Sequence, residues 1–271
     1  MDELRKLIGM EHGLAEVSGA LRGAVQRLAP PVVGALEVTC SDEAQAECCA
    51  AFERQFVEHL LPDLKTGARA PFRTCNLGAR YEDGAVRIAE HHFALLASVR
   101  SFKVMAVKIN AHVAVSEGPA GLRFGPLRRY DADSVACGAL NGLLKGDELP
   151  AIRELRKTFA AGDRDRVAML LDARRVPPEY RLLLAAVASA RLQAARAIED
   201  MRRHKPHSPT LYLVLPCVTL NRTGPDAELI VGYGQVDWRH AEPQVQYEGL
   251  GDDPARYRVE LSAGQLRVAE E

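Results

Sequence analysis

The stretch that decides the fold is Val32-Val-Gly-Ala-Leu36-Glu-Val38-Thr-Cys40-Ser-Asp42. Its first eight residues are mostly apolar and β-branched, which is typical of a strand buried on both faces. Ser41 and Asp42 follow at once and are residue types that begin helices, so we predict a helix over about 43–61. Cys40 and Asp42 then lie at the carboxyl end of a strand, which is where ligand sites form in open α/β sheets.

The rest of the chain supplies further strands and helices. The two-residue alternation of side chains that is typical of a strand is clearest over Ser101–Val115, and it places Lys108, Asn110 and His112 on one side of the predicted strand. The segment Gly84–Phe93 fits either a strand or a helix. We also predict a helix over 2–28, a loop over 62–84, a hairpin at 117–121, a helix after 131 that contains Cys137, helices over 148–161, 163–172 and 178–203, paired strands over 210–221 and 227–236, and a last strand near 257–261.

Length and composition limit the class of protein. The 271 residues carry 35 Lys+Arg against 36 Asp+Glu, 47% of them are hydrophobic and 26% are charged. This composition is globular and excludes a disordered chain, and the net charge of -1 gives no field for nucleic acid or an anionic membrane. No apolar run is long enough to span a bilayer, and residues 1–12 do not resemble a secretion signal. We therefore expect a cytoplasmic protein whose six cysteines stay thiols unless they bind metal.

Four side chains form a set of possible metal ligands, namely Cys40, Asp42, His112 and Cys137. Zinc takes thiolate sulfur, imidazole nitrogen and carboxylate oxygen in a tetrahedron. Spacing alone does not select this set, because a buried cysteine is most often a small hydrophobic residue.

The short sequence motifs around these residues resemble those of a known protein family. In chain order they are Val-Thr-Cys40-Ser-Asp42-Glu43, Leu77-Gly-Ala-Arg80, Glu90-His91-His92, Val107-Lys-Ile-Asn-Ala-His112-Val-Ala-Val and Ser134-Val-Ala-Cys137-Gly-Ala-Leu140. Together they resemble the limiting-CO2-inducible protein B/C family of carbonic anhydrase-like proteins, over about residues 32–145. The resemblance implies an α/β fold with a β-carbonic-anhydrase-like sheet flanked by helices. We expect one domain over 1–271, with a helical insertion in the second half at about 145–205.

The resemblance also implies an activity and its residues. Cys40, His112 and Cys137 would bind Zn²⁺, which lowers the pKa of its bound water to about 7 so that hydroxide can attack carbon dioxide and give bicarbonate. Asp42 would either close the fourth zinc position or turn away to admit water. An arginine normally holds that aspartate off the metal, and Arg80 matches an arginine of the family. A homodimer is implied as well, with carbon dioxide and bicarbonate as ligands and neither nucleic acid nor membrane as a partner.

Two departures from the usual β-carbonic anhydrase pattern leave alternatives open. Position 44, where the usual motif has arginine, is Ala44, and the usual short spacing from the histidine ligand to the second cysteine is absent. One alternative is a catalytically inactive zinc-binding protein that binds bicarbonate or a partner, with Asp42 on the metal. Another is a metal-free enzyme that uses Cys40 as a nucleophile, since a thiol at a helix N-terminus has a lowered pKa.

His91 and His92 have two interpretations. Imidazole titrates near neutrality, so one of them could carry protons between the metal site and solvent. The structural interpretation is that one packs and the other is solvated. Of the remaining cysteines, Cys48-Cys49 and Cys217 are predicted to pack in the interior, and nothing requires Cys75 at the site.

Overall fold

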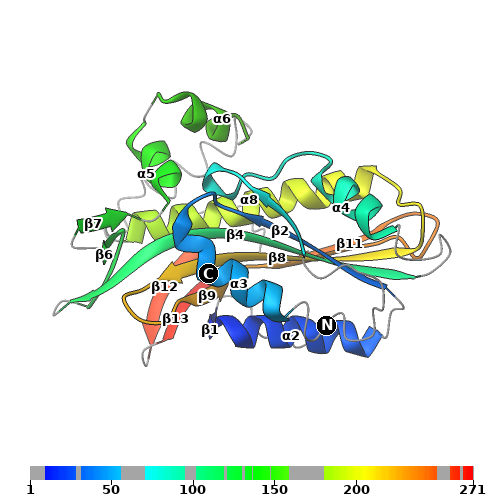
Figure 1. Ribbon diagram of the computed structural model, residues 1–271, viewed down its shortest axis with the longest axis horizontal. Helices are drawn as coiled ribbons and strands as arrows, with labels where there is room; N and C mark the ends of the chain where they lie inside the picture. The colour runs from blue at the N-terminus through cyan, green and yellow to red at the C-terminus, as the bar shows by residue number, and fades with distance from the viewer. Residues whose placement is uncertain are drawn as a thin grey trace.

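The computed structural model describes residues 10–28, 32–55, 71–94, 102–118, 121–129, 132–135, 137–146, 148–158, 180–248, 257–262 and 265–270. Within these residues a long twisted sheet runs through the molecule, and helices cover both of its faces (Figure 1). The α/β class and the helix-flanked sheet predicted from the sequence are confirmed.

Four parallel strands form one side of the sheet, in the order β3 (Phe72–Cys75) at the edge, then β2 (Val32–Thr39), β4 (Lys103–Gly118) and β8 (Thr210–Asn221). β2 pairs with β4 from Val32↔Lys103 to Thr39↔Asn110, and β4 pairs with β8 from Lys103↔Thr210 to Ala114↔Asn221. β2 and β3 therefore stop while β4 and β8 continue. This step in the sheet leaves room beside the second half of β4.

Antiparallel strands extend the sheet beyond β8. The described strands on this side are β9 (Ala227–Ile230), β10 (Tyr233–Asp237), β11 (Gln244–Glu248), β1 (Met10–Gly13), β12 (Tyr257–Ser262) and β13 (Gln265–Glu270), while β5 (Gly121–Phe124) pairs with the end of β4. β9 and β10 both pair with β8, so the strand predicted over 227–236 is interrupted near Val231. The interruption faces Pro216, which has no N–H for the ladder and only accepts a bond from the N–H of Val231 (3.0 Å).

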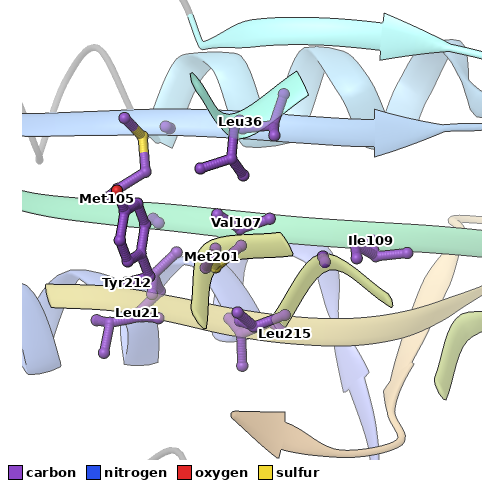
Figure 2. Close-up of a cluster of buried hydrophobic side chains, with 14 of the residues drawn as sticks. Leu21, Leu36, Met105, Val107, Ile109, Met201, Tyr212 and Leu215 are labelled. Carbon is purple, nitrogen blue, oxygen red and sulfur yellow. The ribbon is translucent and has the colours of Figure 1, made fainter. Parts of the chain in front are cut away.

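Helices α4 (Ala85–Ala94) and α8 (Arg181–Arg203) cover one face of the sheet, and α2 (Leu14–Leu28) and α3 (Ala46–Gln55) cover the other (Figure 1). α5 (Gly138–Lys145) and α6 (Pro150–Thr158) lie beyond the carboxyl end of β2. The apolar core fills both layers, with Leu36, Val107 and Met201 among its members (Figure 2). None of the helices in the described ranges is both long and apolar enough to cross a membrane.

Several local predictions are wrong where long-range strand pairing overrides local preference. Met10–Gly13 forms β1 beside β9 rather than the first turns of a helix, and 2–9 lie outside the described residues. β3 occupies 72–75 inside the predicted loop because it pairs with β2. Residues 132–135 form β7, the partner of β6 (Pro126–Arg129), so the helix begins only after Cys137. The predicted helix over 163–172 and residues 56–61 lie outside the described ranges.

Buried thiols and phenols predict a loss of stability at alkaline pH. Burial raises the pKa of Cys48, Cys217, Tyr81 and Tyr212 above their usual range, so these groups stay protonated in the folded protein. Unfolded cysteines and tyrosines ionise near pH 8.5 and 10. Their contribution to the free energy of unfolding is therefore complete below about pH 8.5. It is lost as pH rises, by up to about 1.4 kcal/mol per pH unit for each group.

Urea unfolding from pH 7 to 11 in the presence of reductant measures this loss. Cys217→Ala removes one of the titrating groups, and we expect its free energy of unfolding to fall less steeply with pH than that of the wild type. Equal slopes for the two proteins would contradict the assignment of Cys217.

Candidate metal centre

The step in the sheet brings three predicted ligands together. Cys40 follows the last residue of β2, His112 lies on β4 two residues beyond the point where β2 stops, and Cys137 precedes α5. Their ligand atoms, two Sγ and one imidazole nitrogen, all lie within 4.8 Å of one another. All three side chains are buried, with exposed fractions of 3%, 0% and 0%. Residues nearly one hundred positions apart thus form one cluster.

The imidazole of His112 presents a bare nitrogen to this cluster. Its Nδ1 lies 3.0 Å from Oδ1 of Asn221. Both hydrogens of the Asn221 amide are used elsewhere, toward the carbonyl oxygen of Ala44 (2.8 Å) and Oδ2 of Asp226 (2.9 Å), so Oδ1 accepts and Nδ1 of His112 donates. Nε2 then carries a lone pair. It is buried and has no hydrogen-bond partner among the described residues.

The two thiols differ in how readily they ionise. A hydrogen bond from Cys137 lowers the pKa of Cys40 against the opposing effect of burial. The same bond and burial raise the pKa of Cys137. The N–H of Gly78 also donates to Sγ of Cys40 (3.3 Å). Cys40 is therefore the more acidic of the two thiols.

Backbone strain accompanies the cluster. Cys137 has φ 57° and Ala79, next to Gly78, has φ 56°, and both lie in the left-handed region that non-glycine residues rarely adopt. This conformation of Cys137 directs its N–H to Oδ2 of Asp42 (3.3 Å) while its carbonyl accepts from the N–H of Asn141 (3.1 Å). The strained residue therefore connects a ligand thiol to the start of α5.

This donor set fits a zinc ion. Two cysteine sulfurs and one histidine nitrogen are ligands that zinc prefers, at about 2.3 Å and 2.0–2.1 Å. A buried Nε2 without a partner is costly unless it binds something, and two cysteine sulfurs lie within 4.8 Å of the imidazole ligand atom. The cluster can therefore bind a metal.

Asp42 lies beside the cluster at the protein surface. Its Oδ2 is 3.8 Å from Nε2 of His112, and its side chain is 28% exposed. Two backbone N–H groups hold the carboxylate, that of Ala44 on Oδ1 (2.9 Å) and that of Cys137 on Oδ2. Position 44, which holds no arginine here, thus contacts Asp42 through its backbone.

The predicted pairing of Asp42 with Arg80 is not formed. The Arg80 guanidinium pairs instead with Glu82 (2.9 Å). The Leu77–Arg80 motif does approach the site, but its contact is the hydrogen bond from the N–H of Gly78 to Sγ of Cys40. A Cβ at Gly78 would lie 2.8 Å from Leu155 Cδ2, and φ there is +70°, so the turn requires glycine.

His91 and His92 lie on α4 and not at the cluster. α4 is a helix rather than a strand, and both imidazoles are exposed near its end. The ring of His92 contacts those of Phe72 and Phe93 (centroids 6.1 and 5.4 Å). Phe72 pairs with Leu36, well before the carboxyl end of β2. The structure therefore does not bring either histidine to the cluster.

A cavity of about 440 Å³ opens beside Cys40 and Asp42. Its other lining residues are mostly apolar and come from the turn after β3 and from α5 and α6: Leu77, Gly138, Ala139, Leu149 and Ile152, together with Ser41. Leu77 and Leu149 are 43% and 63% exposed. The cavity thus connects the buried cluster to solvent along an apolar wall.

Sequence reasoning missed Asn221, which bonds His112 and the carbonyl oxygen of Ala44 in the turn after β2, and Asp226, which accepts from Asn221. The available signal was a polar residue that ends an otherwise apolar strand, at the same sheet edge as Cys40. The other cysteines are free thiols outside the cluster, with Cys48 and Cys217 buried as predicted, Cys49 half-buried and Cys75 exposed.

Comparison with known proteins identifies the fold. No protein-family model and no curated protein matches the sequence. Among solved structures, PtLCIB4, a homolog of the limiting CO2-inducible protein LCIB, matches with a TM-score of 0.66 and 13% identity over 92% of this chain and 99% of its own. LCIB matches with a TM-score of 0.53 and 12% identity over 89% of this chain and 95% of its own. The resemblance found in the sequence is confirmed at the level of the fold.

Proposed function

We propose that this chain, which has the fold of the limiting CO2-inducible protein LCIB, is a zinc-dependent carbonic anhydrase that hydrates carbon dioxide reversibly. The observation that carries the proposal is the buried cluster of Cys40, His112 and Cys137, whose bare imidazole Nε2 faces two sulfurs. The apolar cavity beside it supports the proposal because it offers a substrate path to the cluster.

Cys40, His112 and Cys137 would hold the zinc ion. When bound, zinc supplies a Lewis acid that lowers the pKa of water to about 7. The bare Nε2 of His112 is ready as a ligand and the pKa of Cys40 is lowered, whereas Cys137 must lose its proton on binding, so zinc binding releases protons and weakens at acid pH.

Asp42 sets whether the site is open to water. Turnover requires its carboxylate to stay off the fourth ligand position, because four protein ligands make a closed site. In the usual pattern an arginine does this. Here the N–H groups of Ala44 and Cys137 hold the two carboxylate oxygens, and we propose that these backbone bonds replace the arginine.

The cavity wall selects an apolar substrate. Leu77, Leu149 and Ile152 give a surface on which carbon dioxide, which is linear and carries no net charge, loses little hydration. Bicarbonate is charged and is poorly retained by the same wall, which favours its departure to solvent.

Stopped-flow hydration of carbon dioxide by zinc-loaded protein tests the proposal. We expect a rate well above that of buffer, which falls to the buffer rate after zinc is removed with a chelator and returns when zinc is restored. A rate equal to that of buffer at neutral and alkaline pH, with zinc bound, would reject the enzyme.

A second candidate is a closed, inactive zinc site that binds bicarbonate or a partner. It is favoured by the 3.8 Å separation of Asp42 Oδ2 from His112 Nε2 and by the pairing of Arg80 with Glu82. Asp42→Ala separates the two candidates. If Asp42 is the fourth ligand, this variant weakens zinc binding, whereas in the open site zinc affinity stays close to that of the wild type and only hydration changes.

A further inference from the structure

The last residue of β8, Asn221, connects the metal cluster to two other parts of the chain. Its side chain is fully buried and contacts Nδ1 of His112, the carbonyl oxygen of Ala44 and the carboxylate of Asp226. His112 and Asn221 share one face of the sheet because His112 pairs with Thr219, two residues before Asn221. The position is therefore fixed by strand register.

The direction of each hydrogen bond follows from the partners. The carbonyl of Ala44 and the carboxylate of Asp226 can only accept, so they take both amide hydrogens of Asn221. Asp226 is itself fixed, since its Oδ1 accepts from the N–H of Arg222 (3.0 Å). The remaining Oδ1 of Asn221 can only accept, and within the described ranges the donor that reaches it is Nδ1–H of His112. A rotated amide would place two acceptors against its oxygen.

The bond to Ala44 reaches the turn that carries Asp42. The N–H of Ala44 holds Oδ1 of Asp42, while its carbonyl oxygen is held by Asn221. One peptide group on each side of Ala44 therefore links the amide of Asn221 to the carboxylate beside the cluster. A change at Asn221 is transmitted to both His112 and Asp42.

We propose that Asn221 is the positioning residue of the metal centre: it fixes the His112 tautomer with Nε2 bare before any metal binds, and it anchors the turn that presents Asp42. The inference rests on the proposed zinc site for its consequence, but the tautomer is a property of the metal-free protein. Partners that orient a metal-binding histidine typically change metal affinity by about 10–100-fold when they are removed.

Three variants test this role. Asn221→Leu removes all three bonds, and we expect zinc affinity to fall by about 10–100-fold. Asn221→Asp keeps an acceptor for Nδ1–H but loses the donors to Ala44 and Asp226, so the tautomer is retained and zinc affinity exceeds that of Asn221→Leu. Asn110→Leu is the matched control: Asn110 is equally buried, lies on the same face of β4, and bonds Thr219 (2.8 Å), Gln45 and Sγ of Cys48 (3.3 Å) rather than a ligand.

Two measurements read out these variants. Nitrogen-15 NMR of the metal-free protein reports which imidazole nitrogen of His112 is protonated, and competition with a chromogenic chelator gives zinc affinity. We expect Nδ1–H in the wild type, Asn221→Asp and Asn110→Leu, and a mixture or Nε2–H in Asn221→Leu. Equal zinc affinity in Asn221→Leu and Asn110→Leu, or an unchanged tautomer in Asn221→Leu, would overturn the proposal.

Failure of the proposed function gives a different pattern. If the wild type bound zinc but did not hydrate carbon dioxide, the affinity and tautomer results would still decide the role of Asn221. If the wild type bound no zinc at all, the NMR result alone would decide whether Asn221 sets the tautomer, and the metal centre would be the hypothesis that failed.

Discussion

Cys137→Ala is expected to abolish stoichiometric zinc binding and, with it, the hydration of carbon dioxide. The substitution leaves two of three protein ligands, and loss of a ligand exceeds the about 10–100-fold effect of losing a supporting residue. Zinc at a thousand times its Kd stabilises the folded state by about 4 kcal/mol, and this gain disappears in the variant. Because alanine keeps the Cβ, the strain at φ 57° is unchanged.

Cys217→Ala is the matched control for this experiment. Cys217 is as fully buried as Cys137, so both substitutions remove one interior sulfur, but Cys217 lies in β8 outside the cluster. Elemental analysis and thermal unfolding with and without added zinc measure the outcome. Retention of one zinc per chain by Cys137→Ala would contradict the ligand set, and a native protein without zinc that alkylates rapidly at Cys40 would favour the cysteine nucleophile.

Lys108→Met is expected to cost about 3–5 kcal/mol of the free energy of unfolding, the second large effect. Lys108 is 3% exposed and forms an ion pair with Glu228, which is 1% exposed. Sγ of Cys48 donates to the same carboxylate (2.8 Å) and lies 3.0 Å from the ammonium. Removal of the cation leaves the Glu228 charge buried without its countercharge, whereas the methionine fills much of the same volume.

The double variant Lys108→Met/Glu228→Gln distinguishes charge from packing. It removes both charges, and we expect it to recover a large part of the loss, since a buried ion pair adds little over a neutral pair of similar shape. Lys157→Met provides the surface comparison: its pair with Glu154 (2.6 Å) is exposed, and its loss is expected to change the free energy of unfolding far less than the loss of Lys108. Urea unfolding measures all four proteins, and a double variant no more stable than Lys108→Met would contradict the charge argument.

Patterns of nearby residues predicted the central elements well. The β-branched run at 32–39 is strand β2, and the alternation over 101–115 placed Lys108, Asn110 and His112 on one face of β4, as observed. The strands at 210–221 and 257–261 were also found where apolar runs predicted them. These features follow from continuous apolar runs and, in β4, from the two-residue period of a strand, both of which are local properties of the sequence.

Elements that depend on a distant partner were not predicted. β1, β3 and β7 are short, and each is a strand only because another segment supplies its ladder. Arg80 was matched to Asp42 by motif, but the turn at Gly78 sends its side chain to Glu82. His91 and His92 were considered as proton carriers for the site, but they lie near the end of α4, where the ring of His92 contacts Phe72.

The sequence by itself determined the kinds of ligand available, the strand that precedes Cys40 and the face on which His112 lies. Tertiary structure decided which of these groups meet: the pairing of β2 with β4 ends two residues before His112, and the β6–β7 hairpin before α5 returns Cys137 to that gap. It also decided the partner of His112, because Asn221 reaches it only through the pairing of β4 with β8. The periodicity of a strand is a local property of the chain. The meeting of Cys40, His112, Cys137 and Asn221 depends instead on long-range strand pairing, which no short stretch of sequence encodes.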